Sequence, residues 1–223
     1  MKNQKSFSAR RIVVAGMLAA MIVMLDVTGI GMLNIGLGAA ITLFSLPVLV
    51  GVMAEGLSVG LLMGGAFGVI SFVRAFSSPE PLAPLFMNPL VSIVPRLLIP
   101  VVAWLVLKAL HPLYSAGGKK RALARAVAAL AGSLTNTVLV LSMAFLMVAL
   151  GTAIAGMSTA VVGGILLSLI VTNGLPEAVC MMLVVPPILS ALDRSVYKAN
   201  SQPRSAHDTN DGYRQHKHKN RTV

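Results

Sequence analysis

Charged side chains are scarce in this chain, and acidic ones are the scarcest, with 7 Asp and Glu against 18 Lys and Arg. All charged residues together make up 11% of the sequence, whereas a soluble domain carries about 25%. Hydrophobic residues account for 56%, and the mean hydropathy is +0.83. The shortage of charge excludes an ordinary soluble domain and predicts an integral membrane protein built from helices.

The sequence also lacks the motifs that would indicate an enzyme. Its single cysteine, Cys180, excludes a disulfide within the chain, and no group of Cys and His has zinc spacing. A Gly-x-x-x-x-Gly-Lys-Ser/Thr loop, a His-Glu-x-x-His pair and a Gly-x-Ser-x-Gly turn are all absent. We therefore expect no catalysis, no cofactor and no metal site. The net charge of +11 does not indicate nucleic-acid binding, because the basic residues gather in the two tails and one central loop.

Hydropathy and turn signals divide the chain into six expected transmembrane helices and two tails. The all-α membrane domain covers residues 12–194, between an N-terminal tail (1–11) and a basic, disordered C-terminal tail (195–223). Glycine-rich residues 28–38 are interpreted as a mobile outer loop, and proline-rich residues 77–87 as a second loop. The expected helices cover approximately residues 12–27, 39–54, 57–76, 88–110, 122–150 and 176–192.

Residues 151–172 leave two geometries open. The segment is apolar enough to span, but Asn173-Gly-Leu-Pro-Glu177 is typical of a helix start, with a capping residue and an early proline. With six spans, all 18 Lys and Arg except Arg74 and Arg96 lie on the side of the two termini, which the positive-inside rule places in the cytoplasm. We therefore expect 151–172 to form a short outer helix or re-entrant piece. One long, unbroken last helix is the alternative.

The polar residues of the expected helices gather in the outer half of the membrane. Arg96 lies about 12 Å inside its helix, directly after Pro95, which should free a carbonyl one turn back. An arginine at this depth is costly unless it is paired, hydrated or facing a protein interior. We therefore expect a polar cavity, open to the outside, around Arg96 and the following residues: Asp26, Asn136, Asn173 and Glu177.

These residues also have structural interpretations. Arg96 could pair with Glu177 or Asp26 and only hold helices together. Asn173 could be a helix cap, and Arg74 could be an interfacial anchor whose charge reaches toward water. The pair Ala15 and Ala19, four residues apart, could simply pack inside the chain, which their spacing alone favours.

An ordered set of motifs runs through residues 8–195: Ala15-x-x-x-Ala19, Pro47-Val-Leu-Val-Gly51, Asn88-Pro89 leading to Pro95-Arg96, Ser133-Leu-Thr-Asn-Thr137 and Asn173-Gly-Leu-Pro-Glu177. With the small size and the six expected spans, this set resembles the substrate-binding S components of energy-coupling factor (ECF) vitamin transporters. Within that family it is most similar to the pantothenate-type members. The resemblance implies a multi-pass protein of the prokaryotic cell membrane that captures a vitamin from outside. Its implied partners are a membrane coupling protein (EcfT-like) and two cytoplasmic ABC ATPases.

The resemblance also implies roles for individual residues. It makes Ala15 and Ala19 the contact with the coupling protein, and it makes residues 28–38 a loop that closes over the vitamin. The substrate-binding candidates are then Arg96, Asn136, Thr137, Asn173, Glu177, Asp26 and Asn88.

A pantothenate-like ligand suits this set chemically. Arg96 would pair with its carboxylate, and the amide and hydroxyls would contact the polar side chains of the last two helices. Glu177 would repel the carboxylate unless it binds hydroxyls or pairs with an arginine. The only tryptophan, Trp104, lies too deep to stack on a flat ligand, which favours an aliphatic solute. The alternatives are folate, a hydroxymethylpyrimidine, and a self-contained secondary transporter without ATPase partners.

Overall fold

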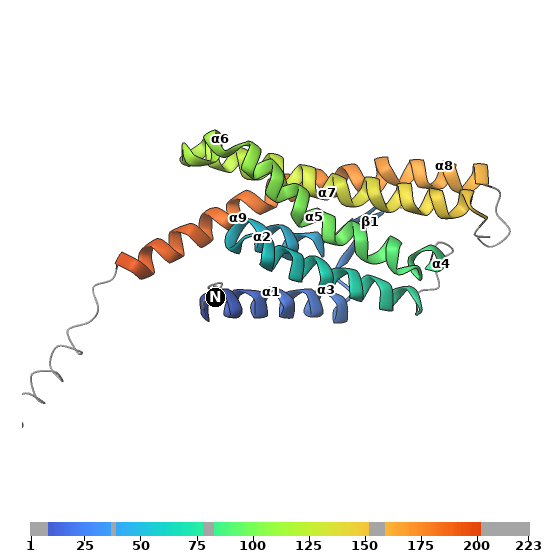
Figure 1. The fold of residues 1–223 in the computed structure, drawn as a ribbon, viewed down its shortest axis with the longest axis horizontal. Helices are drawn as coiled ribbons and strands as arrows, with labels where there is room; N and C mark the ends of the chain where they lie inside the picture. Colours follow the sequence, from blue (N-terminus) through green and yellow to red (C-terminus); the bar gives the residue numbers. More distant parts are fainter. Residues whose placement is uncertain (1–8, 37–38, 78–82, 152–158, 202–223) are drawn as a thin grey trace, which may run out of the picture. The chain divides into compact units, whose positions relative to one another are not determined.

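The computed structural model describes residues 9–36, 39–77, 83–151 and 159–201, and most of these are helical (Figure 1). Several expected helices have nearly the predicted bounds: α1 (Ala9–Val27), α3 (Leu57–Ala75), α5 (Pro89–Ala109) and α7 (Gly118–Ala149). The start of α5 follows its local signals, since Asn88 Oδ1 accepts a hydrogen bond from the Leu90 amide at 3.0 Å and Pro89 occupies the first turn.

The connection from α1 to the next helix is a β-hairpin, so the expectation of an all-α protein is wrong here. β1 (Met32–Gly36) pairs antiparallel with β2 (Ala39–Thr42), with a register shift between Asn34 and Gly36. Residues 39–42 were expected to open the second helix, but α2 covers only Ser45–Glu55. Its 11 residues rise about 16 Å, roughly half of a hydrocarbon core about 30 Å thick.

Backbone pairing and packing explain how a strand is accommodated in this chain. Non-helical backbone is stable inside a membrane only where it is buried in protein or lines a cavity, because lipid offers no hydrogen-bond partners. Here the backbone of β2 pairs with β1, and β2 also packs against the short π-helix η1 (Ile170–Gly174). The hairpin therefore completes the segment that the short α2 leaves unfinished.

The last helix corrects a second expectation. α8 (Thr159–Leu169), η1 and α9 (Leu175–Ser201) follow one another without a break, so the long helix is observed and Asn173 does not start a new one. Pro176 has no N–H for the carbonyl of Thr172 four residues before it. One wider turn accommodates this loss, with the Leu175 amide bonded to the Ile170 carbonyl. The signals taken for a helix start instead mark a π-turn inside a helix.

Shorter pieces lie in two segments that were expected to be loops. α4 (Ala83–Phe86) lies within 77–87, and α6 (His111–Ser115) lies in the basic segment before α7. Residues from Ser190 onward form a separate unit, in which the helix continues to Ser201. The expected disorder of the C-terminal tail concerns mostly residues 202–223, which lie outside the described part of the chain.

Close packing of α3, α5 and α7 builds the core that supports the polar residues. α5 packs against both α3 and α7, and α3 packs against α2. The approach of α3 to α5 depends on glycines: a Cβ on Gly64 would lie 2.5 Å from the carbonyl oxygen of Arg96. That carbonyl receives no helical hydrogen bond from Pro100. Gly64 therefore allows the backbone of α3 to lie directly against the turn of α5 that carries Arg96.

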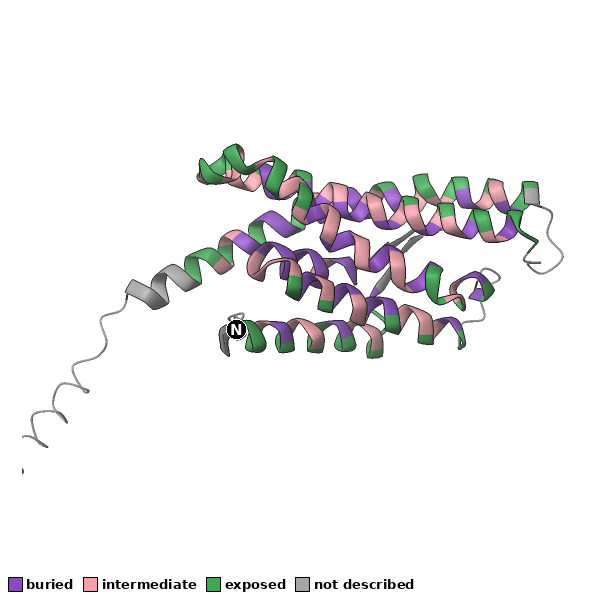
Figure 2. Ribbon diagram, viewed as in Figure 1, coloured by how far each residue is buried: buried purple, intermediate pink, exposed green. Residues whose placement is uncertain are grey.

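The outer faces of the helices suit a lipid environment. Four helical stretches are long and apolar enough to cross a membrane: Leu57–Ala75, Pro89–Ala109, Gly118–Ala149 and Ala160–Ser195. Exposed positions recur along α1 and α8 (Figure 2). They include large apolar residues, such as Met17 at 69% exposed and Leu167 at 71% exposed. Contiguous exposed apolar surface of this kind is rare on soluble monomers. The fold is therefore a mostly helical membrane protein.

Adjacent glycines on α3 provide a matched test of this packing. Gly64→Ala should lower the free energy of unfolding by about 1–3 kcal/mol, because the new methyl group must push α3 away from the Arg96 carbonyl. Gly65→Ala should be neutral or stabilising, since its Cβ would meet only Leu97 Cδ2 at 3.8 Å. Thermal unfolding of both variants in detergent measures the difference. Equal melting temperatures would contradict the close contact between α3 and α5.

Candidate ligand-binding site

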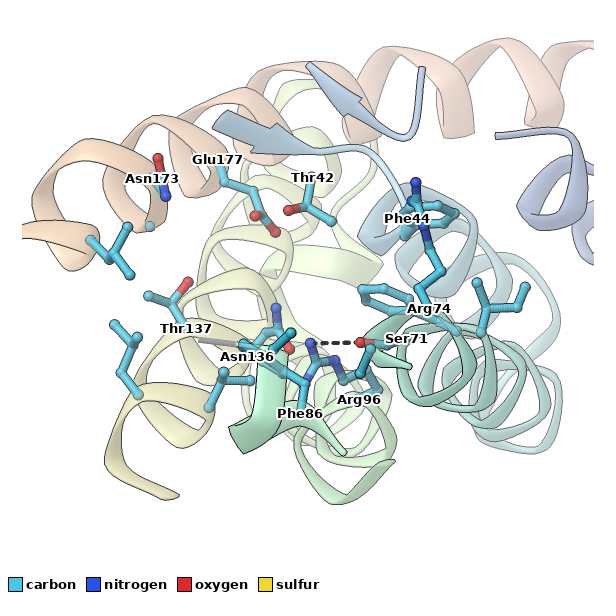
Figure 3. Close-up of a pocket in the computed structure, with 18 of the residues that line it drawn as sticks. Thr42, Phe44, Ser71, Arg74, Phe86, Arg96, Asn136, Thr137, Asn173 and Glu177 are labelled. Carbon is cyan, nitrogen blue, oxygen red and sulfur yellow. Dashed lines mark hydrogen bonds between the residues drawn. The ribbon is translucent and has the colours of Figure 1, made fainter. Parts of the chain in front are cut away.

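A cavity of about 610 Å³ lies among the helices and is lined by most of the predicted polar residues (Figure 3). Its wall combines residues from the end of β2, from α3, α4, α5 and α7, and from η1 and α9. The polar lining residues are Thr42, Ser71, Arg74, Ser77, Arg96, Asn136, Thr137, Asn173 and Glu177. The chain thus brings together five of the seven substrate-binding candidates chosen from the sequence, namely Arg96, Asn136, Thr137, Asn173 and Glu177.

Two apolar clusters contain residues of α7, one before and one after its polar segment. Ala128 and Ala129 belong to the larger cluster, which joins α1, α2, α3, α5, α7 and α9. Ala144 and Val148 belong to a second cluster with residues of α4 and α8. Asn136 and Thr137 lie between these two pairs in the sequence of the same helix. The polar residues that α7 contributes to the pocket therefore lie between two packed apolar clusters.

Arg96 is 7% exposed, and neutral groups hold its guanidinium in place. Nη1 donates to the Val91 carbonyl at 2.8 Å, and Nη2 donates to Ser71 Oγ at 3.2 Å. The Val91 carbonyl is the one that Pro95 frees, because proline cannot donate to the residue four positions before it. Pro95 and Arg96 therefore act together, the proline opening an acceptor that the arginine occupies. Nε has no hydrogen-bond partner among the described residues.

Aromatic rings surround the same guanidinium. Its carbon lies 5.4 Å from the centroid of Phe67 and 5.6 Å from that of Phe86, both within range for cation–π attraction. Phe67 in turn stacks on Phe44, and all three rings line the cavity. Trp104 does not line the cavity, as expected, but these three phenylalanines do, so the position of Trp104 does not decide against a flat ligand. Phe67 lies on α3, Phe86 on α4 and Phe44 in the turn before α2, and no motif marks them, so only the folded chain reveals them.

Glu177 is 4% exposed and lies on a different wall from Arg96 (Figure 3). Its Oε1 accepts hydrogen bonds from Ser45 Oγ at 3.0 Å and Ser133 Oγ at 3.3 Å. In the described part of the chain no ion pair joins Arg96 to Glu177 or to Asp26, so the pairing considered from the sequence is not formed. Each charged group is held by hydrogen bonds to neutral neighbours rather than by an ion pair with the other.

The remaining polar lining comes from α7 and the π-turn. Asn136 is 8% exposed, and its Oδ1 accepts no hydrogen bond from the described residues. Asn173 lies inside η1 and lines the cavity as a side chain of a continuous helix. Gly174 allows this approach, because a Cβ there would lie 2.5 Å from Thr137 Cγ2. The π-turn and α7 therefore form one wall.

Two other candidates lie elsewhere. Asn88 caps α5, and its Nδ2 donates to Met147 Sδ at 3.3 Å, outside the set of lining residues. Asp26 forms an ion pair with Arg74, with 3.3 Å between Oδ1 and Nε, and it does not line the cavity either. Arg74 does line it, although the sequence interpretation made it a surface anchor.

Of the two alanines of α1, Ala15 faces the interior of the chain and Ala19 lies at the border of the core. Ala15 is 8% exposed and belongs to the main apolar cluster, and Ala19 packs against that cluster. Gly16 and Ala20 are exposed, and nothing lies within 4 Å of a Cβ built on Gly16. The exposed small residues of α1 are thus Gly16 and Ala20, each one position after the alanines chosen by spacing, Ala15 and Ala19.

This arrangement suits binding of a small bipolar molecule. Arginines gather on the α3 and α5 side, Glu177 and Asn173 lie on the α9 and η1 side, and Asn136 adds an unpaired acceptor (Figure 3). Within the described residues no group of three or more His, Cys, Asp or Glu side chains could hold a metal ion. The chemistry available is recognition by hydrogen bonds, charge and apolar contact.

Comparison with known proteins gives two matches. Residues 10–189 match a family model described as ECF transporter, substrate-specific component. The chain is also similar to the pantothenic acid transporter PanT of Lactococcus lactis subsp. cremoris (strain MG1363), with 29% identity over 168 residues. That alignment covers 69% of this chain and 78% of the relative.

A pair of substitutions at Glu177 tests whether its charge serves the fold. Glu177→Gln should leave the empty protein as stable or more stable, because an amide oxygen can accept from Ser45 and Ser133 without a buried charge. Glu177→Ala should lower the free energy of unfolding by about 1–3 kcal/mol, since it leaves buried hydroxyls without this acceptor. Melting temperatures without ligand measure both. If glutamine destabilises as much as alanine, the carboxylate is needed for folding rather than kept for a ligand.

Proposed function

Because this chain belongs to the substrate-specific component family of ECF transporters, we propose that it captures pantothenate from outside and delivers it with a membrane coupling protein (EcfT-like) and two ABC ATPases. Membership itself makes the chain a multi-pass cell-membrane protein and a vitamin-uptake component that works with an ECF module. The identity of the vitamin, the composition of the complex and the residue roles below are the proposal.

The observation that carries the proposal is the state of Arg96. Its guanidinium is buried and fixed by Val91 and Ser71, it lines the cavity, and among described residues no carboxylate lies within ion-pair distance of it. A buried cation without a counter-ion is costly, and an anionic ligand would remove that cost. Charge-assisted bonds to a carboxylate are also about twice as strong as neutral ones. A ligand with a carboxylate therefore suits this site.

Pantothenate offers groups for the rest of the cavity. Its amide N–H can donate to Asn136 Oδ1, and its hydroxyls can donate to Glu177, which is acceptor-only when ionised. Its dimethyl group fits the apolar surface provided by Phe44 and Ile70. The similar Lactococcus protein is named as a pantothenic acid transporter, which supports the same choice. Because three phenylalanines line the cavity, folate and hydroxymethylpyrimidine belong in the same binding test.

We also propose the membrane topology expected from the sequence. The order α1, α2, α3, α5, α7 and the continuous α8–η1–α9 provides six crossings with both termini in the cytoplasm. α1 falls outside the four strongest candidate spans, and it carries charge only near its ends, at Arg10, Arg11 and Asp26. The basic residues before and at the start of α7 then face the cytoplasm, as the positive-inside rule requires.

The partner surface on α1 follows from exposure. Small residues let the backbones of two membrane helices approach closely. Gly16 and Ala20 present such a surface outward, whereas Ala15 packs into the core and Ala19 lies at its border. We therefore assign the contact with the coupling protein to the face of α1 that contains Gly16, Ala19 and Ala20, and we assign Ala15 the task of supporting that face from inside.

Titration of the purified protein with a panel of vitamins tests the ligand. We expect pantothenate to bind tightest by isothermal titration calorimetry, and Arg96→Gln to weaken it by about 10–100-fold, the cost of losing a charge-assisted bond. Arg125→Gln is the matched control, because Arg125 is also buried, at 3% exposed, but lies outside the cavity lining. If another vitamin binds most tightly, that vitamin and not pantothenate is the substrate. Equal affinity of wild type and Arg96→Gln would make Arg96 structural.

Bulky substitutions on α1 test the partner surface. Gly16→Trp and Ala20→Trp should leave pantothenate affinity unchanged but abolish ATP-dependent uptake in vesicles that contain the coupling protein and ATPases, because a Trp holds the helices apart. Leu105→Trp, at a half-exposed site on α5, is the control and should transport normally. Normal uptake by both α1 variants would place the partner surface elsewhere.

A further inference from the structure

Two serines hold the carboxylate of Glu177 from behind the wall of the cavity. Ser45 Oγ and Ser133 Oγ lie 3.0 Å and 3.3 Å from the same atom, Glu177 Oε1. Both serines are 0% exposed and neither lines the cavity, whereas Glu177 does. The serines therefore contact the carboxylate from the protein side and are not among the residues that a ligand would touch.

The two serines come from elements that are distant in the sequence. Ser45 is the first residue of α2, and Ser133 lies on α7, three residues before Asn136. Three residues of helix correspond to about 4.5 Å, so Ser133 and Asn136 are neighbours on one side of α7. That side of α7 supports Glu177 through Ser133 and lines the cavity through Asn136.

Ser45 has a second acceptor within reach. Its Oγ lies 3.1 Å from the Thr42 carbonyl as well as 3.0 Å from Glu177 Oε1, and a hydroxyl has only one proton to donate. When a ligand hydroxyl donates to Glu177, Ser45 can turn its proton to the Thr42 carbonyl. The ligand can therefore bind the carboxylate without leaving this buried hydroxyl unpaired, which would otherwise be costly.

Thr42 also belongs to the cavity side of this group. It lines the cavity and contacts the carboxylate of Glu177. Figure 3 shows the hydroxyl of Thr42 and the carboxylate of Glu177 pointing toward each other. A ligand at this wall would therefore meet the carboxylate and a hydroxyl together.

We propose that Glu177 and Thr42 form the subsite for the hydroxylated end of the ligand, and that Ser45 and Ser133 are the positioning residues that hold Glu177 in it. This inference rests on the proposed function, because it assumes that pantothenate binds with its hydroxyls toward Glu177. It adds a specificity: the site selects the hydroxylated ligand over the same skeleton without hydroxyls. An ionised carboxylate is acceptor-only, so a ligand that offers only C–H groups would desolvate it without supplying a donor.

The dideoxy analogue of pantothenate, in which hydrogen replaces both hydroxyls, measures this selectivity. By isothermal titration calorimetry we expect wild type to bind pantothenate about 10-fold or more tightly than the analogue, the cost of losing a hydrogen bond to a charged group. Ser45→Ala and Ser133→Ala should each lower that preference by about 3-fold or more and change the affinity of the analogue little. Glu177→Gln should lower the preference further, because a bond to an amide oxygen is weaker than one to a carboxylate.

Two further variants show whether the serines act through Glu177. When Ser133→Ala is combined with Glu177→Gln, the preference should fall no lower than in Glu177→Gln alone, because the carboxylate that the serine positions is already absent. Ser71→Ala is the matched comparison, since Ser71 bonds Arg96 on the other wall. It should weaken both compounds equally, because both carry the carboxylate. A loss of preference in Ser71→Ala as large as in the other serine variants would contradict the assignment.

The outcomes separate this inference from the proposed function. If wild type binds neither compound, the proposed function fails, and this inference fails with it. If wild type binds both compounds equally, pantothenate remains a ligand but the hydroxyl subsite is wrong. If Glu177→Gln lowers the preference while Ser45→Ala and Ser133→Ala weaken both compounds equally, the serines only stabilise the fold. Gel filtration checks folding, and Ser133→Cys, which nearly keeps the size of the side chain but donates weakly, provides the test should Ser133→Ala fail to fold.

Discussion

The cost of burying one guanidinium governs the part of this protein around the cavity. Arg96 could not lie inside a membrane helix without acceptors, and the chain provides them from nearby. Pro95 removes a backbone donor, which opens the Val91 carbonyl, and α3 brings Ser71 to the other side. That approach of α3 requires glycine, because any side chain at Gly64 would collide with the Arg96 carbonyl. The prolines of α5 and the glycines of α3 thus serve the same side chain.

Neutral partners keep the charged groups of the site apart. A direct bond between Arg96 and Glu177 would satisfy both, but it would also close the space between them. Instead Glu177 accepts from Ser45 and Ser133, while Arg96 donates to a carbonyl and a hydroxyl. The empty site remains polar and open, at the expense of charges that are incompletely compensated. A ligand that offers an anion at one end and donors at the other compensates both, so part of the binding free energy comes from relieving the empty state.

Local signals predicted the elements whose boundaries depend on a few adjacent residues. Asn88 and Pro89 fixed the start of α5, and the Glu55–Gly56 turn separated α2 from α3. The cavity membership of Asn136, Asn173 and Glu177 followed from their depth in the expected helices. The aromatic rings around Arg96 could not be inferred in this way. Phe67 on α3 and Phe86 on α4 are distant in the sequence, and only the packing of α3 against α5 and α4 brings them to one guanidinium, with Phe44 stacked on Phe67.

The two misread segments border the cavity, and a common cause explains both. Ala39-Ala-Ile-Thr42 suits a helix or a strand equally well by its residues, and its pairing with β1 and packing on η1 decide for the strand. In isolation, Asn173-Gly-Leu-Pro176 is a signal for the start of a helix. Here it follows directly on the helix α8, so the proline widens one helical turn and does not begin a new helix. Irregular backbone is tolerated at membrane depth where it is buried in protein or lines a cavity. Both irregular segments contribute residues to the cavity that Arg96 and Glu177 line. An interruption of the helical pattern inside an apolar segment therefore indicates where a polar site lies.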